Sequence, residues 1–134
     1  MYTRPEIISR LQDLGINPTR QRISIAMLML SEHQHLSADQ VLARVREQGA
    51  NVSKATVYNT LSLFAAKGLI REVIVDPARV FYDSNTDYHH HLYNVDTGAL
   101  SDIPAEQFDM PQLPHLPAGT VADGVDVIIR VRNA

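Results

Sequence analysis

The sequence SKATVYNTLSL at residues 53–63 joins a helix-capping signal to a helical hydrophobic repeat. Val57, Leu61 and Phe64 recur every three to four residues and therefore lie on one face of the predicted helix. Ser53 stands immediately before the repeat, where a serine side chain accepts hydrogen bonds from free backbone N–H groups. The remaining faces carry a cation, hydroxyls, a phenol and an amide, so the apolar side of this helix is buried and the polar side is presented outward.

Three more helices are predicted before this stretch, each from a start signal that precedes an apolar repeat. The start signals are Thr3 and Glu6 with Pro5 between them, the pair Asn17-Pro18, and Ser37 with Gln40. Thr3 with Glu6 and Ser37 with Gln40 have the spacing of capping boxes. The second helix is expected to run from Asn17 to about Ser31.

A two-stranded hairpin is predicted after the fourth helix. Residues 70–75 and 80–83 are rich in β-branched and aromatic side chains, and they flank the turn-forming sequence Asp76-Pro77-Ala78-Arg79. Helices followed by such a ribbon have the element order of a winged helix-turn-helix, in which the last helix enters the major groove of DNA. The fold class expected for the whole chain is therefore α+β, with a winged-helix DNA-binding domain at residues 1–84.

The polar side chains of this first domain predict its contacts with DNA. Lys54 and the nearby hydroxyls suit phosphates, whereas Tyr58 and Asn59 suit base edges, the ring against a thymine methyl. The predicted DNA-binding residues are Arg4, Arg20, Arg22, Ser53, Lys54, Thr56, Tyr58, Asn59 and Arg79. The alternative interpretation is that these side chains form a solvated helix face. The order of the helices and the ribbon that follows them favour DNA binding instead.

Composition narrows the class of protein. The chain has 134 residues, 45% of them hydrophobic and 20% charged, which is typical of a folded protein of one or two small domains. The absence of cysteine excludes disulfides and thiolate zinc sites, and it favours a cytoplasmic location. Residues 1–86 hold 10 Lys/Arg and 8 Asp/Glu, whereas residues 87–134 hold 2 and 7. The basic charge that DNA requires is thus concentrated in the first part.

Three consecutive histidines, His89, His90 and His91, open a stretch that alternates like a β-strand. Successive side chains of a strand point to opposite faces, so His89 and His91 converge while His90 points away. Carboxylates near the expected strands are Asp83 and Asp102. Together these groups predict a transition-metal site, against the simpler interpretation of a polar surface run.

The motifs of the chain resemble the ferric uptake regulator superfamily over nearly its whole length. The resemblance rests on GINPTRQR at residues 15–22, on residues 53–63, and on HHHL with Asp96-Thr97-Gly98. Within the superfamily, the iron response regulator (Irr) branch is similar in the triple histidine, in Ser101-Asp102-Ile103-Pro104, and in the early end at residues 125–131. The resemblance implies a homodimeric transcriptional regulator, not an enzyme, that couples metal or haem status to binding of double-stranded operator DNA.

Two departures from the superfamily pattern are expected to matter. Many relatives carry a Cys-x-x-Cys pair that holds a structural zinc, and the corresponding positions here are Asn94 and Thr97, so that zinc is predicted to be absent. Relatives also carry a long helix in the second half. Here the stretch after Ser101-Asp102-Ile103 contains four prolines, which permit at most a turn near residues 105–108.

The resemblance to the peroxide-sensing branch implies a complete ligand set for one divalent metal ion per subunit. The set is His35, Asp83, His89, His91 and Asp102, with His35 expected in the loop before the third helix and His33 as its alternative. Three imidazoles and two carboxylates suit Fe²⁺ or Mn²⁺, and Zn²⁺ also fits. Residues 85–134 are thus expected to form a small α/β domain for metal sensing and dimerisation.

Three further expectations complete the sequence interpretation. His90, Asp109 and His115 are candidates for a second metal site or for haem. The alternating residues 125–131 predict a terminal strand whose edge pairs with a second copy of the chain.

The competing classes of protein are a metalloenzyme and a winged-helix protein-interaction module. No Ser/His/Asp arrangement, His-Glu-x-x-His helix or glycine-rich phosphate loop supports an enzyme, and no stretch approaches the ~20 apolar residues of a membrane span.

Overall fold

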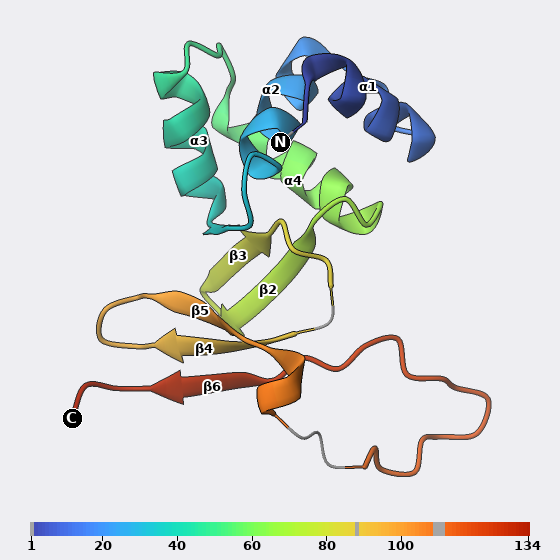
Figure 1. Ribbon diagram of the computed structural model, residues 1–134, viewed down its shortest axis with the longest axis vertical. Coiled ribbons are helices and arrows are strands. Elements are labelled where there is room, and N and C mark those ends of the chain that lie inside the picture. The colour runs from blue at the N-terminus through green and yellow to red at the C-terminus, as the bar shows by residue number, and fades with distance from the viewer. Residues whose placement is uncertain (1, 88, 109–111) are drawn as a thin grey trace. The chain divides into compact units, whose positions relative to one another are not determined.

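The computed structural model describes residues 2–87, 89–108 and 112–134 (Figure 1). The chain divides into two compact units, Met1–Thr86 and Asp87–Ala134. The first unit consists of helices and a small sheet, and the second is built on another small sheet, so the predicted α+β fold class is confirmed.

Four helices form most of the first unit. They are α1 (Arg4–Asp13), α2 (Arg20–Met29), α3 (Ala38–Glu47) and α4 (Lys54–Ala66). The capping boxes of Thr3 with Glu6 and of Ser37 with Gln40 are both formed, and Ser53 accepts a hydrogen bond from the backbone of Thr56. These three predicted helix starts are confirmed.

The start of α2 was predicted too early. Thr19 is the N-cap, and its hydroxyl accepts a hydrogen bond from the backbone N–H of Arg22. Asn17 and Pro18 lie outside the helix, because the Thr19 side chain, and not that of Asn17, satisfies a free backbone N–H group of the first turn. The apolar faces of the four helices meet in a core that includes Ile7, Leu11, Ile25, Met29, Val41, Val45, Val57, Leu61 and Phe64.

The sheet of the first unit has three antiparallel strands. They are β1 (His35–Leu36), β2 (Arg71–Asp76) and β3 (Arg79–Asp83), in the order β1-β3-β2. The hairpin of β2 and β3 is the predicted ribbon (Figure 1). His35 was expected in a loop, and this is wrong. It lies on β1, where backbone pairing places it opposite Asp83.

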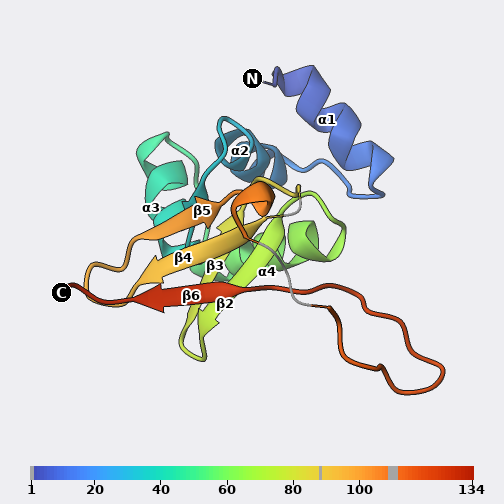
Figure 2. The same ribbon diagram turned by 60° about the horizontal axis from the view of Figure 1, so that its bottom comes forward.

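The second unit contains the strands β4 (His90–Asn94), β5 (Leu100–Ile103) and β6 (Ile128–Val131). Strand β4 lies between the other two, antiparallel to β5 and parallel to β6 (Figure 2). The 3-10 helix η1 (Ala105–Gln107) is the short turn that the prolines were expected to permit. The terminal strand is shorter than predicted, since it begins at Ile128 rather than at Val125.

Within the part of the chain that the structure describes, there is no helix with the length and apolar character of a membrane span.

Candidate metal and nucleic-acid sites

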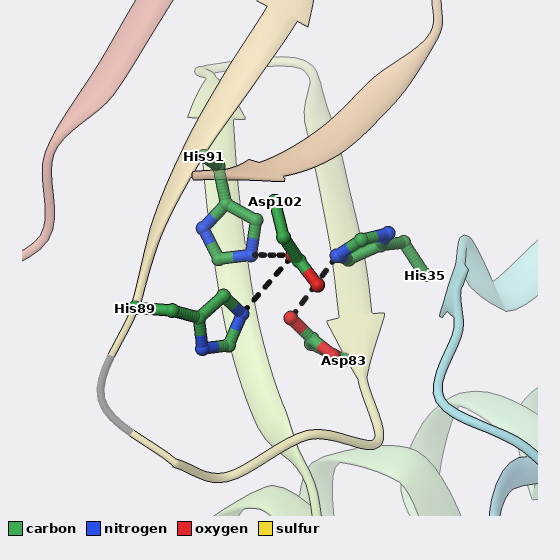
Figure 3. Close-up of side chains that lie close together, drawn as sticks. All are labelled: His35, Asp83, His89, His91 and Asp102. Atoms are coloured by element: carbon green, nitrogen blue, oxygen red, sulfur yellow. Dashed lines mark ion pairs between the residues drawn. The ribbon is translucent and has the colours of Figure 1, made fainter. Parts of the chain in front are cut away.

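The first unit holds an imidazole and a carboxylate on neighbouring strands. His35 on β1 and Asp83 at the end of β3 are directly opposite in the ladder, and Nε2 of His35 lies 3.1 Å from Oδ2 of Asp83 (Figure 3). Asp83 is only 1% exposed. Its other oxygen, Oδ1, accepts a hydrogen bond of 2.9 Å from the backbone N–H of Asn85. This bond fixes the carboxylate with Oδ2 toward the imidazole.

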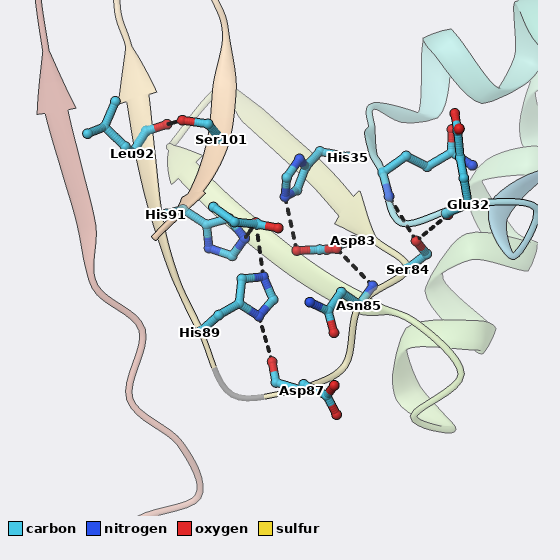
Figure 4. A network of polar contacts seen from close by, with 12 residues as sticks. Glu32, His35, Asp83, Ser84, Asn85, Asp87, His89, His91, Leu92 and Ser101 are labelled. Atoms are coloured by element: carbon cyan, nitrogen blue, oxygen red, sulfur yellow. Dashed lines mark hydrogen bonds and ion pairs between the residues drawn. The ribbon is translucent and has the colours of Figure 1, made fainter. Parts of the chain in front are cut away.

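Ser84 anchors the segment that carries His35. Its hydroxyl accepts from the backbone N–H of Gln34 at 3.0 Å and donates to the carbonyl of Glu32 at 2.8 Å (Figure 4). The partners of these two contacts are 50 and 52 residues apart in sequence, so the contacts tie the bend before β1 to the end of β3. His33 lies on this bend and is exposed. Of the two alternatives, His35 is therefore the one held beside a carboxylate.

The second unit brings together two imidazoles and a carboxylate. Nε2 of His89 lies 3.1 Å from Oδ1 of Asp102, and Nε2 of His91 lies 3.4 Å from the same oxygen (Figure 3). The ligand atoms of these three residues all lie within 4.8 Å of one another. His91 and Asp102 are cross-strand partners on β4 and β5. Both histidines are buried, while Asp102 is partly open to solvent.

A backbone carbonyl sets the tautomer of His89. The Nδ1 atom lies 2.5 Å from the carbonyl oxygen of Asp87, which only accepts hydrogen bonds, so Nδ1 carries a proton (Figure 4). In the neutral ring Nε2 then carries the lone pair, on the side of the ring that faces Asp102. A carbonyl or carboxylate that binds the far nitrogen in this way is the usual outer contact of a metal-ligating histidine. The donor set thus fits a divalent ion.

His90 points into different surroundings from its two neighbours. It is fully buried, and its ring packs edge-on against Phe108 with the centroids 5.2 Å apart. His115 is exposed. Among residues 2–87, 89–108 and 112–134, neither of them belongs to a cluster of metal-ligating side chains. Asp109, the third candidate for a second site, lies outside the described residues.

The residues predicted to bind DNA all belong to the first unit. Arg4 and Arg20 line one cleft beside the N-terminus of α2, of about 860 Å³. Arg22, Thr56 and Asn59 line a second, of about 230 Å³, between α2 and α4. Arg79 is exposed and is the first residue of β3, directly after the turn.

Several of these side chains also have structural partners. The guanidinium of Arg22 donates to the carbonyl of Asn17 at 2.9 Å. The hydroxyl of Ser53 caps α4 and donates to the hydroxyl of Thr56 at 2.9 Å. The hydroxyls of Ser53 and Thr56 are therefore engaged at the helix start, and Asn59 on α4 is exposed.

Tyr58 and Lys54 converge on an acidic residue of α3 that the sequence interpretation missed. The phenol of Tyr58 donates to Oδ1 of Asp39 at 3.0 Å, and Nζ of Lys54 lies 3.7 Å from the same oxygen. The hydrogen bond to Asp39 raises the pKa of Tyr58 above its ordinary value. Asp39 is nineteen residues from Tyr58 in sequence, and no local pattern links the two positions.

Comparison with known proteins places the chain in a family. Residues 13–117 match the model of the ferric uptake regulator family. The peroxide-responsive repressor PerR of Staphylococcus aureus (strain Mu50) is 32% identical over 111 residues, which is 83% of this chain and 72% of that protein.

Solved structures agree in fold. The ferric uptake regulator from Pseudomonas aeruginosa with manganese has a TM-score of 0.69 at 26% identity, covering 93% of this chain and 96% of that one. The ferric uptake regulator from Francisella tularensis with iron has a TM-score of 0.71 at 23% identity, covering 89% and 92%.

The chain belongs to the ferric uptake regulator family, whose members are metal-responsive transcriptional regulators rather than enzymes. Regulators of this family bind DNA as dimers. The superfamily predicted from the sequence is confirmed. The narrower resemblance to the iron response regulator branch stays a prediction.

Proposed function

We propose that this protein is a regulator of iron homeostasis of the iron response regulator type, whose binding to operator DNA depends on one divalent ion per subunit. The proposed ligands are His35, Asp83, His89, His91 and Asp102. The observation that carries the proposal is the pairing of imidazole with carboxylate in each unit, at 3.1 Å in the first and at 3.1 and 3.4 Å in the second.

The donor types favour particular metals. Three imidazole nitrogens and two carboxylate oxygens suit Fe²⁺ or Mn²⁺, and Zn²⁺ accepts the same ligands. The relatives whose structures are described with iron and with manganese support the first two ions. The absence of cysteine excludes a structural thiolate zinc site of the kind expected in many relatives.

The distribution of the ligands supplies a mechanism. Two of them belong to the unit that carries α4, and three belong to the unit that carries β4. An ion that takes ligands from both favours those arrangements of the chain in which all five reach it, and it shifts the equilibrium by its differential affinity. Binding requires the ligating nitrogen of each imidazole to be free of a proton. The Asp87 carbonyl accepts from Nδ1 of His89 and so leaves Nε2 of that ring as the ligating nitrogen.

We further propose that α4 is the reading helix and that β6 contributes to the dimer. Tyr58 and Asn59 are exposed on α4, and the arginines of the two clefts flank the helix start. Strand β6 pairs with β4 on one side only among the described residues, which leaves an edge for a second copy. Haem is proposed as a competitor for the imidazoles of the metal site.

The proposal is tested by selecting duplexes from a randomised library with the protein in Mn²⁺ and, separately, in a chelator. A common sequence that is enriched in only one of the two conditions supports a metal-responsive regulator. Equal enrichment in both, or no enrichment in either, contradicts it.

A further inference from the structure

Asp39 occupies a position from which it acts on two residues of the proposed reading helix. It lies in the first turn of α3, while Lys54 and Tyr58 lie one turn apart on α4. Its Oδ1 atom accepts a hydrogen bond of 3.0 Å from the Tyr58 hydroxyl and lies 3.7 Å from Nζ of Lys54. The Lys54 ammonium is also 5.5 Å from the centroid of the Tyr58 ring. One carboxylate oxygen therefore contacts both side chains.

The contact with Asp39 sets the hydrogen-bonding polarity of Tyr58. A phenol has one O–H to donate, and when that O–H is hydrogen-bonded to the carboxylate only the acceptor lone pairs of the oxygen remain for another partner. In the major groove the donors are the amino groups of adenine and cytosine, whereas N7 of the purines, O6 of guanine and O4 of thymine are acceptors. A Tyr58 hydroxyl held in this way favours an adenine or cytosine amino group and disfavours the acceptor-rich edge of guanine.

The same carboxylate limits the non-specific contribution of Lys54. An ammonium that is shared between a carboxylate and a DNA phosphate contributes less to phosphate binding than a free one. The carboxylate itself also repels the phosphate backbone. Asp39 lies in the first turn of α3, where the N-terminus of a helix interacts favourably with negative charge.

We propose that Asp39 is a positioning residue that sets the sequence specificity of this protein, by orienting the Tyr58 hydroxyl as an acceptor and by restraining Lys54. This inference rests on the proposed function, in which α4 reads DNA. The inference adds a residue of α3 to those of α4. Removal of the Asp39 carboxylate is expected to strengthen binding to unrelated DNA and to weaken discrimination between the selected duplex and unrelated DNA.

The test uses the full chain in Mn²⁺, a duplex selected from a randomised library and a scrambled duplex of the same composition. The variants are Asp39→Ala, Asp39→Asn, Tyr58→Phe and the double variant Asp39→Ala/Tyr58→Phe. Glu47→Gln is the matched control, because it removes one negative charge from the last turn of the same helix. Asp39→Asn keeps an acceptor oxygen but removes the charge, so it separates the two effects.

For the orientation of Tyr58, the readout is the ratio of affinities for the selected and scrambled duplexes. Asp39→Ala should lower this ratio both in the wild-type background and in the Tyr58→Phe background. The decrease should be roughly three- to tenfold larger in the wild-type background, as expected for one exposed hydrogen bond. Asp39→Asn should retain part of the ratio. Carbon-13 tyrosine NMR should show the pKa of Tyr58 falling toward its ordinary value in Asp39→Ala. This half of the inference is overturned if the effects of Asp39→Ala and Tyr58→Phe on the ratio are additive in free energy and the pKa of Tyr58 is the same in Asp39→Ala as in the wild type.

For Lys54, the readout is the salt dependence of binding to the scrambled duplex. Asp39→Ala and Asp39→Asn should both bind it more tightly and steepen the slope by up to about one phosphate contact, whereas Glu47→Gln should leave the slope unchanged. An unchanged slope in the Asp39 variants overturns this half. If the wild-type chain selects no sequence under any metal condition, the proposed function itself fails, which is a distinct result.

Discussion

His35 and Asp83 are cross-strand partners on β1 and β3, and Nε2 of the histidine lies 3.1 Å from Oδ2 of the aspartate. His91 and Asp102 repeat this relationship on β4 and β5, at 3.4 Å. Directly opposite residues of an antiparallel pair point to the same face with their Cβ atoms ~4.5–5.5 Å apart. Each unit therefore presents an imidazole beside a carboxylate through backbone pairing alone.

The first prediction separates the faces of β4. His91→Ala should weaken Mn²⁺ binding by at least about 100-fold, because a ligand contributes more than the outer contacts whose loss costs 10–100-fold. His90→Leu should leave binding nearly unchanged, since His90 packs against Phe108 and leucine preserves its volume. Isothermal titration calorimetry measures both. His115→Ala is the exposed control, and the reverse order of effects would show that the assigned strand face is wrong.

The second prediction concerns the anchor of β1. Ser84→Ala removes a hydroxyl that bonds to the backbone of both Gln34 and Glu32, so it should destabilise the first unit by about 1–3 kcal/mol. The free energy of unfolding from urea titration gives this value. Ser9→Ala, at an exposed position of α1, is the control and should change stability little. Equal stability of Ser84→Ala and the wild type would mean that these bonds do not hold the segment.

The third prediction concerns DNA recognition by α4. Tyr58→Ala should remove most of the preference for a selected duplex over a scrambled one, because it removes a base-contacting side chain. Lys54→Ala should weaken binding to both duplexes by a similar factor and flatten the salt slope, because it removes a phosphate contact and leaves Asp39 without its cation. Fluorescence anisotropy measures both variants. A uniform loss for Tyr58→Ala argues against base readout.

The fourth prediction concerns haem. Titration of the metal-free protein should shift the Soret band, and the double variant His89→Ala/His91→Ala should remove the shift. Added Mn²⁺ should slow haem binding, since both use the same imidazoles. Only one or two of the three consecutive histidines reach an iron axially, because alternation along β4 turns His90 to the opposite face. Haem that persists in the double variant lies elsewhere, for instance at His115.

The helices and the hairpin follow from local signals in the sequence. Capping residues such as Ser37 and Ser53 act within three residues of their partners, so their role is visible in the sequence itself. The start of α2 was misplaced because Asn17 and Thr19 are both residue types that cap helices well, and the sequence does not choose between them. The first turn of α2 also has a tertiary contact, from the Gln21 side chain to the Asn51 carbonyl, which no local pattern predicts.

The candidate sites were less fully predictable, for a physical reason. Strand alternation separates His90 from its neighbours without any knowledge of the fold. The strand position of His35 depends on pairing with β3, almost fifty residues later, and a two-residue strand has no periodic signal of its own. The contact of Asp39 with Tyr58 likewise arises only when α3 packs beside α4.

Metal-dependent DNA binding is tested by fluorescence anisotropy, which gives the affinity for a selected duplex in Mn²⁺ and in a chelator. We expect Mn²⁺ to change the affinity of the wild-type chain for this duplex by at least about tenfold and to leave the affinity of the His91→Ala variant unchanged. Equal affinities in the two conditions, for protein that calorimetry shows to have bound Mn²⁺, would contradict this expectation.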